Sequence, residues 1–258
     1  MKSSMTDTAA PWVVGIGLLV LWEFCVVFFE IEAVVLPTAT QAFYAIYEFR
    51  GPLWTNSMAT LWATLVGFGF AVAFGILMGV AIGTSRLLYK AFYPLLVGFN
   101  SVPKVAVVPI LVIWFGIGFV PAVITAFVIS FFPIVVNVAT GLATIEPELE
   151  DVLRALGARK VDILLKVGIP RSLPYLFASL KVAITLAFVG SVIAETVAGN
   201  EGVGHVMLVA SSDFNVPLVF AGLIVIAFMG IAMYGIFAVI ERRFTGWATR
   251  SMEYATGG

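Results

Sequence analysis

Two long stretches of the sequence contain no charged residue, and they constrain the fold more than any other feature. One runs from Gly51 to Ser85 and the other from Val105 to Ile145. A bilayer core about 30 Å thick is crossed by roughly 20 apolar helical residues. Either stretch is long enough for one crossing, and the second is long enough for two. A soluble fold could not hide this surface, because its exterior must be covered by polar groups.

Continuous apolar runs, rather than apolar and polar residues in alternation, favour helices over the strands of a membrane barrel. The third predicted span contains Pro103 and Pro109, and we expect it to be broken near them. The fold class is therefore an all-α, polytopic membrane protein. Six spans are predicted, at residues 12–30, 58–84, 90–115, 119–143, 174–198 and 216–240.

The distribution of lysine and arginine predicts the orientation, because these residues are enriched in cytosolic segments. Among the segments outside the spans, those on the side of the N-terminus carry nearly all of them, and the opposite side carries only Arg50. Both termini are thus predicted to be cytosolic. We predict an N-terminal span with an external linker (1–55), a transmembrane domain (56–245) and a cytosolic tail (246–258).

Composition excludes several classes of protein and site. With Cys25 as the only cysteine and His205 as the only histidine, the chain has no intrachain disulfide, CxxC metal site or multi-histidine centre. Its 14 basic and 15 acidic residues give no bulk positive field for nucleic acid. The pattern G-x-x-x-x-G-K-[ST] does not occur, so ATP is not bound through a P-loop. We expect no catalytic residue, metal or cofactor in this chain.

One long polar segment, residues 144–172, separates the fourth and fifth spans. An acidic run around Pro147 opens a helix, and Gly157 closes it. A second short helix is expected over 159–167, with Pro170 and Pro174 before the next span. The first helix carries an apolar stripe formed by Leu149, Val152, Leu153 and Leu156. Such a stripe fits either a groove on a partner protein or the surface of the lipid.

The sequence of this segment resembles a known family. Asp151-Val152-Leu153-Arg154-Ala155-Leu156-Gly157 and, after nine residues, Val167-Gly168-Ile169-Pro170 are similar to the coupling-loop motif of ABC importer permeases. The opening Asp151-Val152-Leu153 departs from the Glu-Ala-Ala of the motif. The blocks 103–109 and 113–118 resemble the nitrate, sulfonate, taurine and bicarbonate branch, and the resemblance extends over about 55–245.

The resemblance implies a type I importer permease of the bacterial inner membrane. It also implies partners: two cytosolic ABC ATPase subunits that bind ATP and Mg, a second permease copy forming a homodimer, an external solute-binding protein, and the lipid bilayer. The residues implied to contact the ATPases are Glu150, Asp151, Leu153, Arg154, Ala155, Leu156, Gly157, Ala158 and Pro170.

Polar residues inside the spans are candidates for a solute path, because each is costly in the bilayer. Lys104 lies 14 residues from both Lys90 and Gly118, or about 21 Å of helix, which places it near the midplane. A cation there suits an anionic solute, although it could instead snorkel or pair with an acid. The remaining candidates, which could also simply hydrogen-bond between helices, are Asn100, Ser101, Asn137 and Glu195.

The predicted function is that of a permease subunit of an ATP-driven importer, which is not itself an enzyme. We expect its solute to be a small organic anion such as a sulfonate or taurine, or nitrate. The same branch also leaves thiamine-type pyrimidines, riboflavin and aromatic carboxylates open. A secondary transporter driven by an ion is the alternative from another class, although two related halves, typical of such carriers, are not found in the sequence. A membrane enzyme would need polar groups clustered at one depth, and none is evident.

Overall fold

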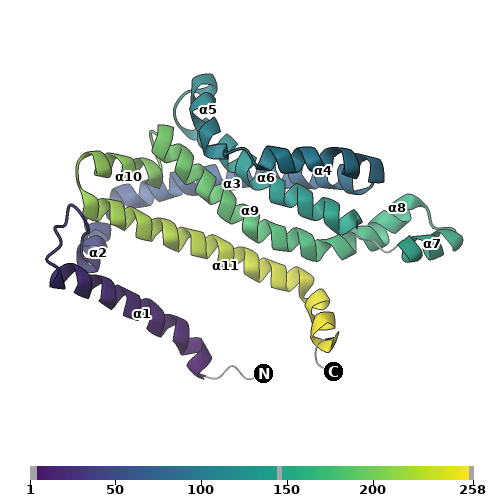
Figure 1. Cartoon of the computed structure of the whole chain (residues 1–258), viewed down its shortest axis with the longest axis horizontal. Coiled ribbons are helices and arrows are strands. Elements are labelled where there is room, and N and C mark those ends of the chain that lie inside the picture. Colours follow the sequence, from purple (N-terminus) through teal and green to yellow (C-terminus); the bar gives the residue numbers. More distant parts are fainter. Residues whose placement is uncertain (1–4, 144–146, 256–258) are drawn as a thin grey trace.

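The computed structural model describes residues 5–143 and 147–255, and every regular element in these ranges is a helix (Figure 1). The elements, in chain order, are α1 (Met5–Phe28), α2 (Ala39–Glu48), α3 (Arg50–Gly83), α4 (Arg86–Asn100), the 3₁₀ helix η1 (Lys104–Val107), α5 (Val108–Phe115), α6 (Phe119–Ala143), α7 (Pro147–Ala155), α8 (Lys160–Ile163), the π-helix η2 (Leu164–Gly168), α9 (Ile169–Ala198), α10 (Val203–Ser212) and α11 (Val216–Ala255).

The predicted all-α membrane fold is confirmed. Four helical stretches are long and apolar enough to cross a bilayer: Arg50–Gly83, Phe119–Ala143, Val161–Ser212 and Val216–Thr245. The predicted third span is a bent pair, Leu87–Asn100 and Lys104–Phe115, with an angle of 79° between its parts. The predicted first span is a shorter apolar helix, Trp12–Phe28. Its length of about 26 Å is slightly less than the bilayer core.

The centre of the molecule is the packing of α3 against α6. Small residues recur at every fourth position on one face of α3: Gly67, Ala71, Gly75, Gly79 and Gly83. They let the two backbones approach closely, as small residues do at helix interfaces in membranes. A Cβ atom on Gly67 would lie 2.6 Å from the backbone oxygen of Val123. At the other end of the stripe, a Cβ atom on Gly83 would lie 2.9 Å from the backbone oxygen of Ala139.

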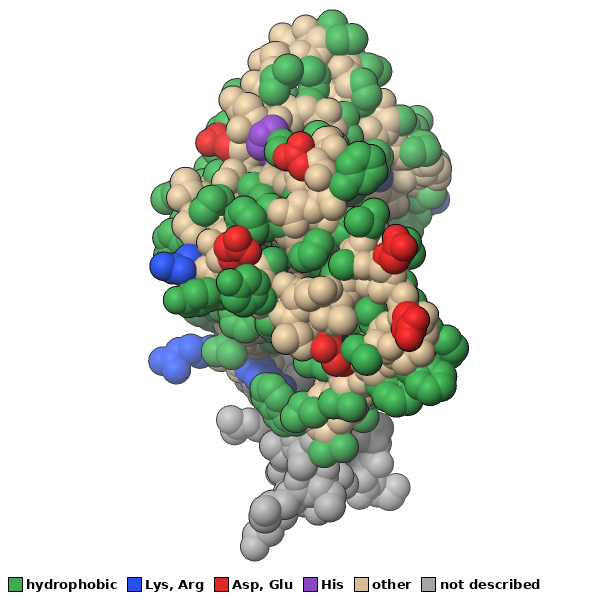
Figure 2. All heavy atoms as spheres, turned by 90° about the vertical axis from the view of Figure 1, so that its left-hand side faces the viewer, with side chains coloured by type: hydrophobic (Ala, Val, Ile, Leu, Met, Phe, Trp, Pro, Cys, Tyr) green, Lys and Arg blue, Asp and Glu red, His purple; other side chains and the backbone are tan. Residues whose placement is uncertain are grey.

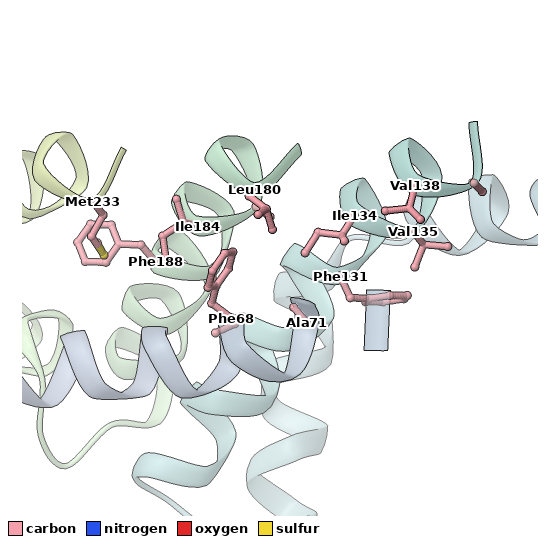
Figure 3. Close-up of a cluster of buried hydrophobic side chains, with 14 of the residues drawn as sticks. Phe68, Ala71, Phe131, Ile134, Val135, Val138, Leu180, Ile184, Phe188 and Met233 are labelled. Atoms are coloured by element: carbon pink, nitrogen blue, oxygen red, sulfur yellow. The ribbon is translucent and has the colours of Figure 1, made fainter. Parts of the chain in front are cut away.

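α9 and α11 complete the core around this pair of helices. Figure 3 shows buried side chains from four helices meeting there, with Phe68 from α3, Ile134 from α6, Ile184 and Phe188 from α9, and Met233 from α11. Phe68 also packs edge-on against Phe237 of α11. The helices that pass the core are therefore held together by apolar packing along much of their length.

The described contacts of α1 with the rest of the chain lie toward its C-terminal end. Trp22 donates a hydrogen bond from Nε1 to the oxygen of Pro37 at 3.0 Å, and Glu23 accepts one from Thr40 Oγ1 at 2.7 Å. The outer turns of α1 leave apolar side chains such as Trp12 exposed, and Figure 1 shows the helix leading away from α2. This surface is apolar enough to face lipid.

The two ends of the bundle differ in charge. One end, here called the α10 end, carries α2 and α10, and Figure 2 shows separated acidic side chains over it. The exposed acidic residues of the α10 end include Glu30, Glu32, Glu48, Glu201 and Asp213. At the other end, here called the α7 end, the chain places Lys166, Arg171, Arg242 and Arg243 near α7 and the last part of α11.

Candidate functional site

The segment predicted to couple the chain to a partner projects from the α7 end of the bundle (Figure 1). α7 ends in a Schellman motif at Gly157. The residue has a φ of 86°, a conformation that glycine adopts without steric strain. The N–H of Gly157 donates to the oxygen of Arg154 at 2.9 Å, and the N–H of Ala158 donates to the oxygen of Leu153 at 3.0 Å. The predicted helix end at Gly157 is confirmed.

Apolar side chains project from this segment without cover from the rest of the chain. Val152 and Leu156 of the α7 region are 57% and 78% exposed, and Val161 and Leu165 beyond the turn are 62% and 57% exposed. Leu153 is half-buried, whereas Asp151, Arg154 and Ala155 are exposed. Charged and apolar side chains thus share one accessible tip.

Residues 144–146 lie outside the described residues, and so do the side chains of residues 147–150, including the predicted contact residue Glu150. The backbone of Glu150 lies in α7.

The prediction of a separate second helix ending before Pro170 is wrong. α8 continues through the π-helical turn η2 directly into α9, and Pro170 lies in the first turn of α9. A proline would normally clash with the carbonyl four residues before it, here that of Lys166. The wider π turn over Leu164–Gly168 carries the chain past this point, so the helical path continues. Pro174 lies inside α9 as well.

Three of the predicted path residues meet at the break between α4 and η1. The non-helical residues Ser101, Val102 and Pro103, here called the α4–α5 break, are all exposed. Lys104 Nζ donates to Asn100 Oδ1 at 2.7 Å and to the backbone oxygen of Asn100 at 2.9 Å. Ser101 Oγ donates to the oxygen of Val97 at 3.1 Å.

The other two predicted path residues lie elsewhere. Asn137 donates from Nδ2 to the oxygen of Pro133 in its own helix, at 2.8 Å. Glu195 is 4% exposed, near the α10 end of α9. Among the described residues, no hydrogen bond joins either of them to the α4–α5 break.

Glu195 belongs to a buried polar cluster that fixes the start of α10. Its Oε2 accepts hydrogen bonds from Thr60 Oγ1 at 2.9 Å and from the N–H of Gly204 at 3.1 Å. Thr60 Oγ1 accepts one from the N–H of Val203 at 2.9 Å. Three segments are thereby tied together, and a carboxylate lies at the positive end of α10.

Gly202 completes this cluster and leaves no room for a side chain. Its φ is 100°, and a Cβ atom there would lie 2.2 Å from Cδ of Glu195. Its N–H donates to Asn56 Oδ1 at 2.7 Å. Glu195 therefore has a packed structural setting at the α10 end.

The sequence interpretation missed Asn56 and Thr60, although a signal for them was present. They stand four residues apart, with Thr64 four further on, in a span that is otherwise mostly apolar. Thr64 Oγ1 contacts Ser191 Oγ of α9 at 3.1 Å. Polar residues at helical spacing in such a span indicate a contact between helices.

We expect Thr60→Val to destabilise the chain by about 1–2 kcal/mol, because Glu195 and the N–H of Val203 each lose a buried hydrogen bond. Thermal unfolding of the purified protein in detergent measures the effect. Thr55→Val is the matched control, because Thr55 is exposed and its hydroxyl donates to the oxygen of Gly51 in its own helix. Equal melting temperatures for the two variants would contradict the role of the cluster.

Comparison with known proteins agrees with this architecture. Residues 71–246 match the family described as binding-protein-dependent transport system inner membrane component. Three relatives are a riboflavin transport system permease protein, RibX, of Chloroflexus aurantiacus, a formylaminopyrimidine transport permease protein, ThiX, of Halalkalibacterium halodurans, and a putative aliphatic sulfonates transport permease protein, SsuC, of Bacillus subtilis.

These similarities extend over most of each chain. RibX is 32% identical over 89% of this chain and 87% of its own. ThiX is 28% identical over 92% and 95%, and SsuC is 26% identical over 92% and 88%. A structure of the MetNI methionine ABC transporter in an inward-facing conformation has a chain with a TM-score of 0.67. That match, at 22% identity, covers 77% of this chain and 98% of the other.

Proposed function

The chain belongs to the binding-protein-dependent transport system inner membrane components, the permeases of ABC importers, and from this premise we propose that α7 couples it to a cytosolic ATPase. Its family makes it a multi-pass inner membrane protein and a transport subunit. The observation that carries the proposal is the exposed apolar tip of α7, closed by the Schellman motif at Gly157.

The continuous helix from α8 to α9 gives this contact a mechanical consequence. α9 packs against both α6 and α3, which form the core of the bundle. When two ATPase subunits close on ATP, they move α7 and α8. The motion passes through η2 into α9, and the core helices then rock to open the path to one side of the membrane at a time. ATP and Mg are bound by the ATPases.

The proposed assembly contains two ATPase subunits, a second copy of this permease and an external solute-binding protein. In it, α7 faces the cytosol and the acidic α10 end faces outward. This orientation agrees with the excess of lysine and arginine in the segments at the α7 end. Family membership favours this ATP-driven importer over the secondary transporter considered from the sequence.

The solute we propose is a small organic molecule or nitrate. The names of the three relatives give three different solutes: riboflavin, formylaminopyrimidine and aliphatic sulfonates. The relatives therefore favour no single solute. The sequence prediction of a sulfonate, taurine or nitrate stays open, and so do aromatic carboxylates.

We expect Leu156→Glu to abolish co-purification of the partner ATPase without lowering the amount of permease in the membrane. Leu156 is 78% exposed, so its own chain loses little packing, whereas a carboxylate would be buried in the ATPase groove. Both subunits are co-expressed, and the ATPase bound per permease is measured after purification in detergent.

Val35→Glu is the matched control. Val35 is 72% exposed and lies between α1 and α2, at the opposite end of the molecule. This variant is expected to retain its ATPase. If Leu156→Glu retains its ATPase to the same extent, the proposed contact is wrong and α7 is an interfacial helix on lipid.

A further inference from the structure

The break between α4 and η1 lies at the depth of the bundle's middle. Phe99, the last residue but one of α4, packs against Phe131, with 6.3 Å between ring centroids. Phe131 is close to the midpoint of the spanning helix α6 (Phe119–Ala143). Beyond the break, α5 rises to the α10 end, where the N–H of Gly118 donates to the oxygen of Ala198 at 3.2 Å.

Exposed non-helical backbone at this depth cannot face lipid. The hydrocarbon core offers no hydrogen-bond partner, so irregular backbone occurs there only where protein covers it or water reaches it. Ser101, Val102 and Pro103 are exposed on the surface of this chain, so its own helices do not cover them. In the membrane, this surface must therefore either be covered by a partner chain or border a water-filled cavity, and the unpaired cation beside it favours water.

Lys104 differs from three other ionisable side chains inside the apolar helices, Lys181, Glu195 and Glu23. Lys181 forms an ion pair with Glu241 of α11. Glu195 is enclosed by the cluster around Thr60, and Glu23 accepts hydrogen bonds from Thr40. Each of these has a partner on a different element of the bundle.

Within the described part of the chain, the amine of Lys104 bonds only to two oxygen atoms of Asn100, in its own segment. It is half-buried, and no carboxylate of the described residues pairs with it. An ammonium group has three N–H donors, so one remains for a ligand. The contacts to Asn100 hold the amine at the break, where it does not reach toward either end of the bundle.

We propose that the α4–α5 break forms a wall of the solute path, and that Lys104 binds an anionic group of the solute there, such as a carboxylate, sulfonate or phosphate. This inference rests on the proposed function as a permease, with the second copy closing the opposite wall. A cation in a narrow cavity with low-dielectric walls raises the local concentration of anions and their rate of entry by about 10-fold or more.

Cysteine labelling tests the proposal without knowledge of the solute, because Cys25 is the only natural cysteine. Ser101→Cys is made in a Cys25→Ser background and reconstituted in lipid nanodiscs with the partner ATPase. Labelling rates are measured with two water-soluble thiosulfonates, the anionic sulfonatoethyl and the cationic trimethylammonioethyl methanethiosulfonate. Phe228→Cys is the control, because Phe228 is 74% exposed near the middle of α11.

We expect both reagents to label the cysteine at position 101 and neither to label the one at 228. Adding Lys104→Met should lower the rate with the anionic reagent about 10-fold and leave the rate with the cationic one equal or higher. Adding Lys104→Arg should preserve the preference for the anion. Val102→Cys repeats the measurement if the first cysteine disturbs assembly.

Two results would overturn the inference. One is an assembled complex in which neither position 101 nor position 102 reacts, since the break would then be sealed from water. The other is a ratio of anionic to cationic rates that Lys104→Met does not change. Both results leave ATPase binding intact, whereas a wild-type chain that binds no ATPase contradicts the proposed function itself.

Discussion

Replacing Gly67 by valine is expected to lower the stability of the folded bundle by about 3 kcal/mol or more, at the upper end of the range for overpacked cores. The first carbon of the new side chain would lie 2.6 Å from the backbone oxygen of Val123 and 2.6 Å from Cβ of Ala126. A clash with backbone atoms cannot be relieved by a change of rotamer, as a clash with a flexible side chain can. α3 and α6 would therefore have to separate along the stripe of small residues.

Gly69→Val provides the matched control in the same helix. A Cβ atom on Gly69 meets nothing within 4 Å, and Gly69 is exposed on the surface of the chain. The same valine should therefore change stability little at this position. Unfolding is followed by loss of monodisperse protein on heating in detergent. Similar losses for the two variants would mean that α3 and α6 do not pack as closely as the structure shows.

The spans could be predicted because membrane insertion depends on length and apolar character, which are local properties of the sequence. The break near Pro103 and the helix end at Gly157 could also be predicted from the sequence, since a proline lacks an N–H and a glycine tolerates positive φ. Both residues impose their effect on their immediate neighbours. Their structural consequences can be predicted without knowledge of what packs around them.

Contacts between distant segments could not be predicted in this way. Thr60 bonds to Val203 across 143 residues of sequence, and nothing near Thr60 specifies that partner. The continuation of α8 into α9 was missed for a related reason. Pro170 taken alone indicates a helix end, and only the π turn before it shows how the chain accommodates the ring.

Gly157→Val is expected to uncouple the permease from ATP hydrolysis while leaving its spans folded. Valine is strongly disfavoured at positive φ, and the left-handed conformation costs an L-residue about 1–2 kcal/mol. This strain is enough to reduce the population of the native turn roughly tenfold. A Cβ atom at this position meets nothing within 4 Å in the chain itself, so the strain is confined to the backbone of the loop.

Gly157→Asn separates the backbone conformation from the mere presence of a side chain. Asparagine adopts the left-handed conformation far more readily than valine does. It should therefore preserve the Schellman motif and most of the coupling. If both variants fail equally, the groove on the ATPase excludes any side chain, and the backbone argument is wrong although the contact is right.

One measurement tests most directly whether this chain is a permease driven by an ATPase through the α7 segment. The rate of ATP hydrolysis is measured in nanodiscs containing the chain, its partner ATPase and its solute-binding protein loaded with solute. We predict that Gly157→Val lowers the stimulated rate about tenfold relative to Gly157→Asn. Full stimulation of the Gly157→Val complex, with the ATPase bound, would contradict the claim.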